Sequence, residues 1–501
     1  MIRMKTSTRI VLSGVAAAFF YLTAFAQTPG KTGFRFASEG GEPGQRLLSN
    51  SIVDMVPYGS DVLMGTGNGL SVWHIQDQDW DSFSADFGMG EGSVSALDAK
   101  DGVIWAATAY TASTSQGPLP AGGGVGFSTD DGYTWTWFDQ PVDSADQSKD
   151  PDSLLIDKPT TTNVQNVTYD LQVTSTEVWI TSWGGGLRKY SFADSTWHIV
   201  TPDEQKFSSL DHLNHRAFAV TGDDSVLWVG TAAGINKSTD GGETWENFNH
   251  SENGISGNFV TALGRQQWGS YDILWAATWQ AEASGEFYGV SKTENGGITW
   301  EVVLTDPDQT LKAHNFAFDD SIVYVATNLG LYKSVDLGES WEIFPQIADS
   351  ASGDLLYGSE VYSALAYENL LFVGTADGIA LSPDLGNNWY FYMGLRAYLP
   401  TNQNGQPATY AYPNPFSPRL HDVIRFQYDL PSAGRVTVKI FDFAMDEVAT
   451  VVQNKYRNAG DNYEAWTGLR GNGEPVATGV YFYSVERSSA DPVWGKFAVI
   501  H

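Results

Sequence analysis

Short runs in which apolar and polar residues alternate, each ended by Gly, Asn or Asp, occupy most of the chain between Leu47 and Leu395. The stretch from Leu227 to Trp245 shows the whole pattern: the apolar segment LWVGT is followed by AAG, INKS and the polar turn TDGGETW. Alternation with a period of two predicts half-buried β-strands, and the Gly and Asn positions predict tight turns. Around this stretch we expect four strands, at 217–221, 227–231, 234–238 and 244–248.

The apolar segment returns along the chain at a spacing near fifty residues. Its seven copies begin at Val62, Val103, Val178, Leu227, Ile273, Val323 and Leu371. Units of four strands that repeat every 40–50 residues or so are typical of β-propellers, in which each sheet covers the apolar face of its neighbour. The pattern therefore predicts an all-β protein with a seven-bladed β-propeller over residues 47–395.

The second half of the repeat is the motif Ser/Thr-x-Asp/Asn-x-Gly-x-x-Trp, which occurs five times. In this motif the Asp or Asn side chain can accept hydrogen bonds from turn amides, Gly can adopt positive φ, and Trp can pack between sheets. We therefore expect the five acceptor residues to stabilise the fold and not to act in catalysis. They are Asp130, Asp240, Asn295, Asp336 and Asp384.

These five motifs resemble the Asp-box, or bacterial neuraminidase repeat, of sialidases, some endoglucanases, sortilin-type receptors and photosystem assembly factors. The first and third repeats depart from it, with GLSVWHIQDQDW and GLRKYSFADSTW, and together with LLSNSIVDMV they are similar to the WD40/YVTN-like repeats of sensor ectodomains. The resemblance implies that the Asp-box turns lie on the rim opposite a ligand-binding mouth.

Three segments interrupt the regular spacing and are expected at that mouth: the acidic insertion 139–162 and two long loops, 110–124 and 279–289. Loops of this kind carry function more often than the strands do. We select five candidate ligand-binding residues in or beside the mouth loops, whose aromatic members could stack on a sugar ring or a peptide or could serve in ordinary packing. They are Tyr110, Trp183, Arg216, Trp279 and Tyr288.

Catalytic alternatives are less well supported. A sialidase needs three converging arginines, and Arg188, Arg216 and Arg265 fall at unrelated strand positions. A glycosidase needs two carboxylates about 5–9 Å apart, for which the candidates are Asp139, Asp143, Asp211 and Glu286. Five histidines, predicted to lie in connections at the mouth, include a His-x-x-His pair that could bind zinc beside Asp211; they are His198, His212, His215, His250 and His314. We expect no catalytic residue, metal or cofactor, with a surface glycoside hydrolase, sialidase-like or endoglucanase-like, as the alternative.

The N-terminal residues 1–26 read as a secretory signal peptide, with Arg3, Lys5 and Arg9 before an apolar run and Ala24-Phe25-Ala26 as the cleavage site. A leader follows at 27–46, and we expect no transmembrane segment. With 28 Lys and Arg against 59 Asp and Glu, the net charge is −31, which opposes binding to nucleic acid or anionic lipid. The chain has no cysteine, so packing and backbone pairing must hold an exported fold together.

After a linker at 396–409, residues 410–501 form a second predicted domain. YPNPFS from Tyr412, followed by IRFQYDLPSAGRVTVKIFD and WTGLRGNGEPVATGVYFYSV, resembles the C-terminal sorting domain of type IX secretion cargo and the immunoglobulin-like part of flagellar hook-capping proteins. The resemblance implies a β-sandwich, the type IX machinery as partner, and an extracellular or outer-membrane-surface location. The positions that match the family, with implied roles in turn geometry, core packing and recognition, are Asn414, Pro415, Phe416, Gly479, Tyr481 and Lys496. We therefore expect a non-catalytic surface module that binds a glycan or a peptide.

Overall fold

The structure is a computed structural model in which the described residues are 47–143, 155–157, 159–281, 284–344, 347–351, 353–357, 360–393, 409–487 and 490–501. The predicted signal peptide and leader, nearly all of the linker and much of the acidic insertion lie outside these residues. Contacts between Cα atoms divide the chain into two compact units, 1–395 and 396–501. Each unit is considered by itself.

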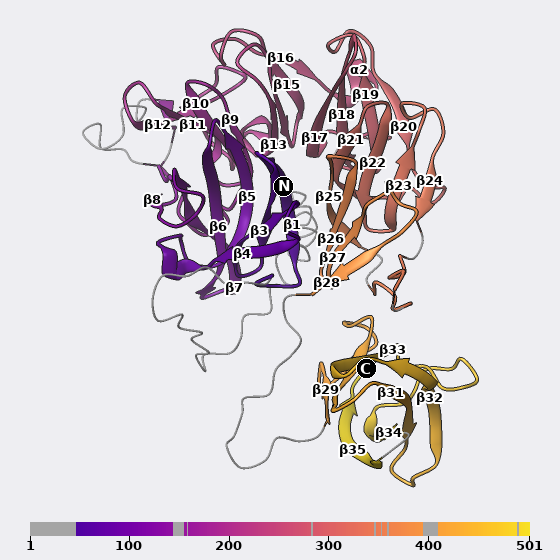
Figure 1. Ribbon diagram of the computed structural model, residues 1–501. Helices are drawn as coiled ribbons and strands as arrows, with labels where there is room; N and C mark the ends of the chain where they lie inside the picture. The colour runs from indigo at the N-terminus through magenta and orange to yellow at the C-terminus, as the bar shows by residue number, and fades with distance from the viewer. Residues whose placement is uncertain are drawn as a thin grey trace, which may run out of the picture. The chain divides into compact units, whose positions relative to one another are not determined.

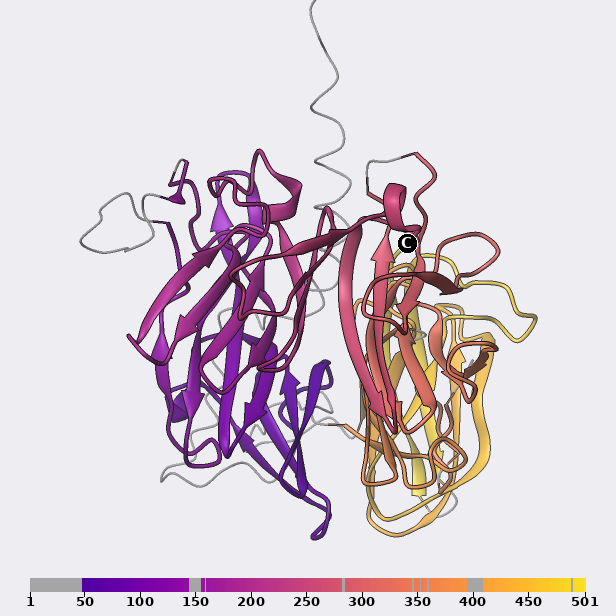
Figure 2. The same ribbon diagram turned by 90° about the horizontal axis from the view of Figure 1, so that it is seen from above.

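The described residues of the first unit form seven antiparallel sheets of four strands, in chain order. In Figure 1 the first strand of each sheet lies near a common centre, and Figure 2 shows the strands from a direction 90° away. The first three sheets are β1 (Ile52–Tyr58), β2 (Asp61–Thr66), β3 (Gly69–His74) and β4 (Asp79–Phe83); β5 (Ser93–Lys100), β6 (Val103–Thr114), β7 (Gly117–Ser128) and β8 (Thr136–Phe138); and β9 (Thr168–Val173), β10 (Glu177–Ser182), β11 (Gly186–Ser191) and β12 (Thr196–Val200).

The other four sheets are β13 (Ala217–Gly222), β14 (Leu227–Thr231), β15 (Gly234–Ser238) and β16 (Glu246–Phe248); β17 (Phe259–Trp268), β18 (Tyr271–Trp279), β19 (Gly289–Thr293) and β20 (Glu301–Leu304); β21 (Ala313–Asp319), β22 (Ile322–Thr327), β23 (Gly330–Ser334) and β24 (Glu342–Phe344); and β25 (Val361–Tyr367), β26 (Leu370–Thr375), β27 (Gly378–Ser382) and β28 (Tyr390–Tyr392). Short helical turns, η1 (Ala85–Phe87), η3 (Leu213–His215) and α2 (His250–Asn253), lie in the connections.

Two local expectations need correction. β16 begins at Glu246, two residues later than expected, because the Asp-box turn extends through Trp245. The segment 110–124 is not a loop: β6 and β7 continue as a paired hairpin, with Tyr110 opposite Ala121 and Thr114 opposite Gly117. The Gly- and Pro-rich composition that favours a loop is therefore overridden by pairing between the two strands.

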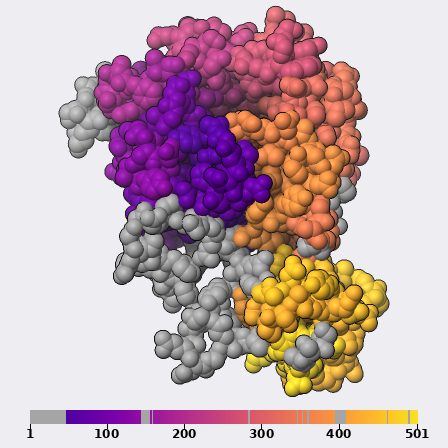
Figure 3. All heavy atoms as spheres, viewed as in Figure 1, coloured from indigo at the N-terminus to yellow at the C-terminus, as the bar shows by residue number. Residues whose placement is uncertain are grey.

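The hydrophobic core of the first unit lies between successive sheets. Each second strand contains a run of buried residues, as in β14 (LWVGT) and residues 371–375 of β26 (LFVGT), because both faces of this part of the strand pack on neighbouring sheets. The seventh sheet packs on the first: Phe372 and Met64 share one cluster, the Ser363 hydroxyl donates to the Ile52 carbonyl at 3.1 Å, and Gly378 N–H donates to Asn50 O at 2.8 Å. The indigo first sheet and the orange seventh sheet meet in Figure 3. The sheets therefore close into a ring.

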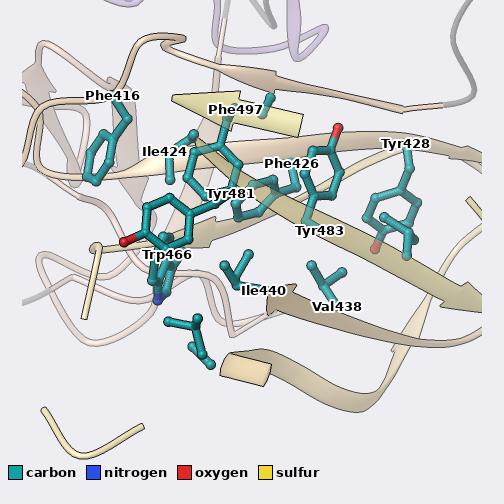
Figure 4. Close-up of a cluster of buried hydrophobic side chains, with 14 of the residues drawn as sticks. Phe416, Ile424, Phe426, Tyr428, Val438, Ile440, Trp466, Tyr481, Tyr483 and Phe497 are labelled. Carbon is teal, nitrogen blue, oxygen red and sulfur yellow. The ribbon is translucent and has the colours of Figure 1, made fainter. Parts of the chain in front are cut away.

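The second unit consists of two antiparallel sheets that share one core. β29 (Thr409–Tyr412), β30 (Ile424–Leu430) and β33 (Gly460–Trp466) form one sheet, and β32 (Glu447–Arg457), β31 (Gly434–Phe441), β34 (Gly479–Arg487) and β35 (Ala490–Val499) form the other, in that order. Alternate residues of both sheets turn inward, as the period of two requires. The resulting cluster is dominated by the aromatic rings that Figure 4 labels, including Phe416, Phe426, Tyr483 and Phe497.

Candidate functional site

The two ends of the ring differ in their connections. In a four-stranded meander, the turns between first and second strands and between third and fourth strands lie at one end. The turns between second and third strands and the links to the next sheet lie at the other, which we call the mouth end. The five Asp-box turns, between third and fourth strands, are therefore opposite the mouth end. First-to-second-strand turns are short, as between β1 and β2 or β17 and β18, whereas the links to the next sheet at the mouth end are long.

The Asp-box residues hold their own turn together. Asp240 Oδ1 accepts the Ser238 hydroxyl at 2.8 Å and the Thr244 N–H at 3.0 Å, and its Oδ2 accepts the Thr244 hydroxyl at 2.6 Å. The hydroxyl oxygen of Ser238 accepts Gly242 N–H at 2.9 Å. Hydrogen bonds, led by that of the Thr244 hydroxyl, lower the pKa of Asp240 to about 2. The equivalent acceptors make the same kind of network: Asp130, Asn295, Asp336 and Asp384.

Each Asp-box turn also packs on the preceding sheet. The indole of Trp245 meets that of Trp179 edge-on, with ring centroids 6.2 Å apart, and a Cβ at Gly242 would lie 2.5 Å from the Trp179 ring. The ammonium of Lys237 lies over Trp228 and donates to Gly296 O in the next turn at 2.7 Å. The motif's polar atoms thus stabilise the turn itself, and its Trp and Gly pack the turn on the preceding sheet.

At the mouth end, the first strand of every sheet contains a one-residue bulge, at which the pairing register shifts. A bulge re-aims the extra side chain and is common at barrel rims and beside binding sites. The extra residues are Val53, Ser95, Tyr169, Phe218, Thr261, His314 and Tyr362. The aromatic ones contact their neighbours: Phe218 lies 5.7 Å from Tyr169 between ring centroids, and His314 lies 6.4 Å from Tyr362. Of these residues only His314 was selected from the sequence, as a histidine, because the bulges themselves appear only in the strand register.

The first strands also carry half-buried carboxylates that join neighbouring sheets. Asp54 on β1 accepts Leu97 N–H of the second sheet at 3.0 Å, and Asp170 on β9 accepts Val220 N–H of the fourth sheet at 2.8 Å. Asn315 accepts Ala364 N–H at 3.0 Å from the same register position of the sixth sheet. Burial raises the pKa of Asp54 to about 7, although amide donors oppose the rise, and raises that of Asp170 well above its usual value.

The aromatic candidates occupy different environments. Tyr110 is exposed on the β6–β7 hairpin. Trp183 lies in the β10–β11 turn beneath the guanidinium of Arg216, whose carbon is 5.4 Å from the ring centroid. Trp279 is the last residue of β18 and is only 4% exposed, packed near Tyr288 at 6.1 Å between ring centroids. Trp183 and Arg216 therefore come together as a pair, as Trp279 and Tyr288 do, and Trp279 is a wall residue with little surface for a ligand.

Lys312, which sequence reasoning missed, lies beside the second of these aromatic pairs. Its ammonium is 5.2 Å from the Trp279 ring centroid and 5.6 Å from that of Tyr288. A cation over an aromatic face is held by the ring quadrupole. The only sequence signal was the position of Lys312 immediately before a first strand, which is too general to select it.

The arginines do not converge into a carboxylate-binding triad. Arg188 on β11 donates to the buried Asp143 at 2.6 Å, and Arg265 on β17 is held by Asp223 and Asp272. The Nε of Arg216 donates to the Ser209 carbonyl at 2.6 Å. Each side chain is thus committed to a separate local contact.

Three of the four acidic candidates at the mouth end accept hydrogen bonds that stabilise their loops. Asp143, besides its contact with Arg188, accepts Thr161 N–H at 2.9 Å. Asp211 accepts the Ser208 hydroxyl at 2.9 Å, and Glu286, only 5% exposed, accepts the N–H of Ala281. Asp139 is exposed, directly after β8.

The histidines are more scattered than the sequence suggests. His198 lies within β12 and His314 within β21, so the prediction that all five occupy connections was wrong for these two. His215 is buried, with Nε2 2.8 Å from Asp203 Oδ1 and Nδ1 accepting Ser208 N–H at 3.0 Å. Both of its ring nitrogens are therefore engaged, which leaves none for a metal. Over the described part of the chain, no group of three or more acidic or histidine side chains is placed to hold a metal ion.

The positions that resemble the sorting-domain pattern lie around the last strand or pair with it. Asn414 Oδ1 accepts Ala498 N–H at 3.0 Å, and Phe416, fully buried, exchanges backbone hydrogen bonds with Ala498 and Ile500. Tyr481 lies 5.7 Å from Phe497 between stacked rings. The remaining three positions are placed as follows: Pro415 lies between Asn414 and Phe416, Gly479 begins β34 opposite Val499, and Lys496 is exposed on β35 opposite Phe482.

None of the helices within the described residues is both long and apolar enough to cross a lipid bilayer. No protein-family model matches the chain, and no curated protein sequence does.

Solved structures with a similar fold are β-propellers. The GH74 enzyme of Niastella koreensis is 14% identical with a TM-score of 0.51, covering 92% of this chain and 75% of that one. PorZ of Porphyromonas gingivalis, described as an essential bacterial surface component of the type IX secretion system, is 15% identical with a TM-score of 0.36, covering 90% and 75%. The WD40 β-propeller domain of Doa1 is 10% identical with a TM-score of 0.41, covering 68% and 96%. At these identities the likeness concerns the fold alone: the chain is all-β, and its four-stranded sheets resemble those of the GH74 structure.

Proposed function

We propose that the first unit is a seven-bladed β-propeller with Asp-box repeats that acts as a non-catalytic binding or scaffold module at the cell surface. The observation that carries this proposal is the contrast between the two ends of the ring. One end carries short turns, five of which use their motif's polar groups within the turn and pack on the preceding sheet, whereas the mouth end carries long and dissimilar segments. Binding residues are found on loops of this kind, supported by a rigid scaffold.

The acidic residues at the mouth end favour binding over hydrolysis. A glycosidase needs one carboxylate that can hold a proton and a second that is free to attack or to activate water. Asp143, Asp211 and Glu286 instead accept hydrogen bonds that fix the surrounding loops. Hydrolysis by the mouth remains the alternative, and a product assay in the experiment below tests it.

The second unit is proposed to be an immunoglobulin-like sorting domain that delivers the propeller through the type IX machinery. Its support is the resemblance of the YPNPFS segment together with the contacts this segment makes. Asn414 and Phe416 hold the final residues of β35, so the matching positions stabilise one end of the domain. Lys496 remains exposed for recognition. The proposed route requires the signal peptide at 1–26, which lies outside the described residues.

Two measurements test these proposals. Deletion of residues 410–501 should leave the propeller folded but retained in the periplasm, whereas unchanged surface display would overturn the sorting role. In the second measurement the purified mature chain is incubated with glycan and peptide arrays. Binding without release of shortened products is expected, and catalytic release of a reducing sugar would replace the binding module with a glycosidase.

A further inference from the structure

A cavity of ≈ 350 Å³ opens at the mouth end beside Trp183. Its walls come from three places in the chain: the tip of the β6–β7 hairpin, the segment 160–165, and the β10–β11 turn together with Ser209 and Leu210. This volume is near the lower limit of the roughly 300–1,000 Å³ found for small-molecule sites. The cavity therefore suits a small ligand or one terminal portion of a larger one.

The chemistry of the lining is unusual for so acidic a protein. None of the described residues that line the cavity is ionisable, although the chain has 59 Asp and Glu. Hydroxyl and amide side chains predominate instead. Within the described residues, five of them make no side-chain hydrogen bond to the protein, so their donors and acceptors are available to a ligand: Ser115, Gln116, Thr160, Thr162 and Gln165.

The floor of the cavity is held in place from behind. The carbonyl oxygen of Gly184 accepts the hydroxyls of Thr161 and Ser209, both at 3.0 Å. The buried carboxylate of Asp143 accepts Thr161 N–H. Gln165 has a φ of 59°, a conformation that is uncommon for a residue other than glycine, and its N–H donates to Pro120 O at 2.7 Å. Such bonds fix the lining before a ligand arrives, which reduces the entropic cost of binding.

Trp183 supplies an aromatic wall. The guanidinium of Arg216 lies over its ring, and this guanidinium is itself held by the carbonyls of Ser209 at 2.6 Å and Leu210 at 3.1 Å. The indole is therefore fixed in place while it lines the cavity. An aromatic face combined with neutral donors and acceptors matches a ligand that carries both C–H faces and hydroxyl groups.

We propose that this cavity binds a neutral saccharide. Among the described lining residues there is neither a cation to pair with a phosphorylated, sulfated or sialylated ligand nor a carboxylate to pair with a basic peptide, so burying either charge against these residues would lose hydration without compensation. A neutral sugar can exchange its water contacts for the hydroxyl and amide groups of the lining. The inference rests on the proposed function of the mouth end as a binding surface and specifies the ligand class.

The test measures binding of the mature full-length chain to neutral gluco-, manno- and galacto-oligosaccharides by titration calorimetry, beside sialylated and sulfated oligosaccharides and basic peptides. Binding to at least one neutral series is expected. Trp183→Ala should weaken it at least tenfold, and so should the double substitution Ser115→Ala/Gln116→Ala, which changes only exposed side chains and so cannot act through unfolding. Trp268→Ala is the matched control and should leave binding unchanged, because this exposed tryptophan lies at the opposite end of the ring, beside the β17–β18 turn.

The outcomes distinguish a failure of the neutral-saccharide site from a failure of the proposed binding function. If the chain binds only charged glycans or peptides, the neutral-saccharide site is refuted while the binding module stands. The same holds if a neutral sugar binds but both mouth variants retain full affinity. If no glycan or peptide binds at all, the proposed binding function fails, and this inference fails with it.

Discussion

Substitution of Asp54 by Asn should make the first unit less sensitive to alkaline pH. The Asp54 carboxylate is half-buried on β1, and its Oδ2 accepts Leu97 N–H of the next sheet. The natural chain already contains Asn315 at the equivalent position of the sixth sheet, where its amide oxygen accepts Ala364 N–H at 3.0 Å. Asp54→Asn is therefore expected to keep the bond between the sheets while removing a group that ionises.

The raised pKa of Asp54 determines that stability falls as the pH rises. Burial raises the pKa of Asp54 from 3.8 to about 7, so between these values the folded state holds a proton that the unfolded state has lost. The stabilisation is fully present below pH 4 and is lost as the pH rises through 7. A shift of three units corresponds to about 4 kcal/mol at most, and we expect roughly 2 kcal/mol because the carboxylate is only half-buried.

The measurement is equilibrium unfolding in urea at pH 5 and pH 8, followed by tryptophan fluorescence. Because pH 5 already lies above 3.8, Asp54→Asn should exceed the natural chain's stability by less than about 1 kcal/mol at pH 5 and by roughly 2 kcal/mol at pH 8. Asp130→Asn is the matched control: it also exchanges an Asp for the Asn found in an equivalent turn, at Asn295, but hydrogen bonds lower the pKa of Asp130. Asp130→Asn should therefore change the pH dependence of the free energy of unfolding only below pH 4. The reasoning is refuted if Asp54→Asn retains the full pH dependence of the natural chain.

Two further substitutions test which contacts stabilise each unit. Gly242→Ala should lower the free energy of unfolding by about 1–3 kcal/mol, because φ at this residue is 86° and the new Cβ would lie 2.5 Å from the Trp179 ring. Gly241→Ala is also at positive φ but has no atom within 4 Å of its Cβ, so it should cost less in the same thermal unfolding experiment. Equal losses for the two variants would show that the contact with Trp179 is not the cause. Glu464→Gln should destabilise the second unit by about 3–5 kcal/mol, because the buried guanidinium of Arg457 donates to both Glu464 carboxylate oxygens, at 2.8 and 2.9 Å. A loss below about 1 kcal/mol in urea unfolding would contradict this prediction.

The strands of the first unit could be predicted because the repeat supplies the same evidence seven times. Errors in one copy, such as the late start of β16, are limited to a residue or two. The β6–β7 hairpin was missed because Gly and Pro dominate its sequence, and both residues normally weaken strands. Pro118 and Pro120 are nevertheless accommodated opposite Ser113 and Thr111. Pairing between two long strands outweighed the local preference there.

The candidate site was less predictable because it depends on register and on contacts distant in sequence. Tyr169, Phe218 and His314 gain their positions from bulges, which no local motif announces. His314 was assigned to a connection for the same reason. The lining of the cavity combines residues near positions 115, 162 and 184, and their side chains are common polar types. Trp183 was selected individually, as an aromatic residue in a turn, whereas the segments 110–124 and 139–162, which supply other lining residues, were expected at the mouth only as segments.

The strand position occupied by Asp54 and Asp170 differs between repeats. The same register position is Ala96 in the second sheet and Ala219 in the fourth. In the second sheet, Asp98 accepts Val173 N–H of the third sheet at 2.7 Å instead, so neighbouring first strands are joined from different positions at different junctions. The Asp-box turns, by contrast, repeat one hydrogen-bond network in five sheets. Stability supplied by the turns leaves the first strands and the mouth end free to differ from sheet to sheet. Because the turns and the first strands both stabilise the ring, the connections at the mouth end can vary in length and composition, and the cavity lies among them.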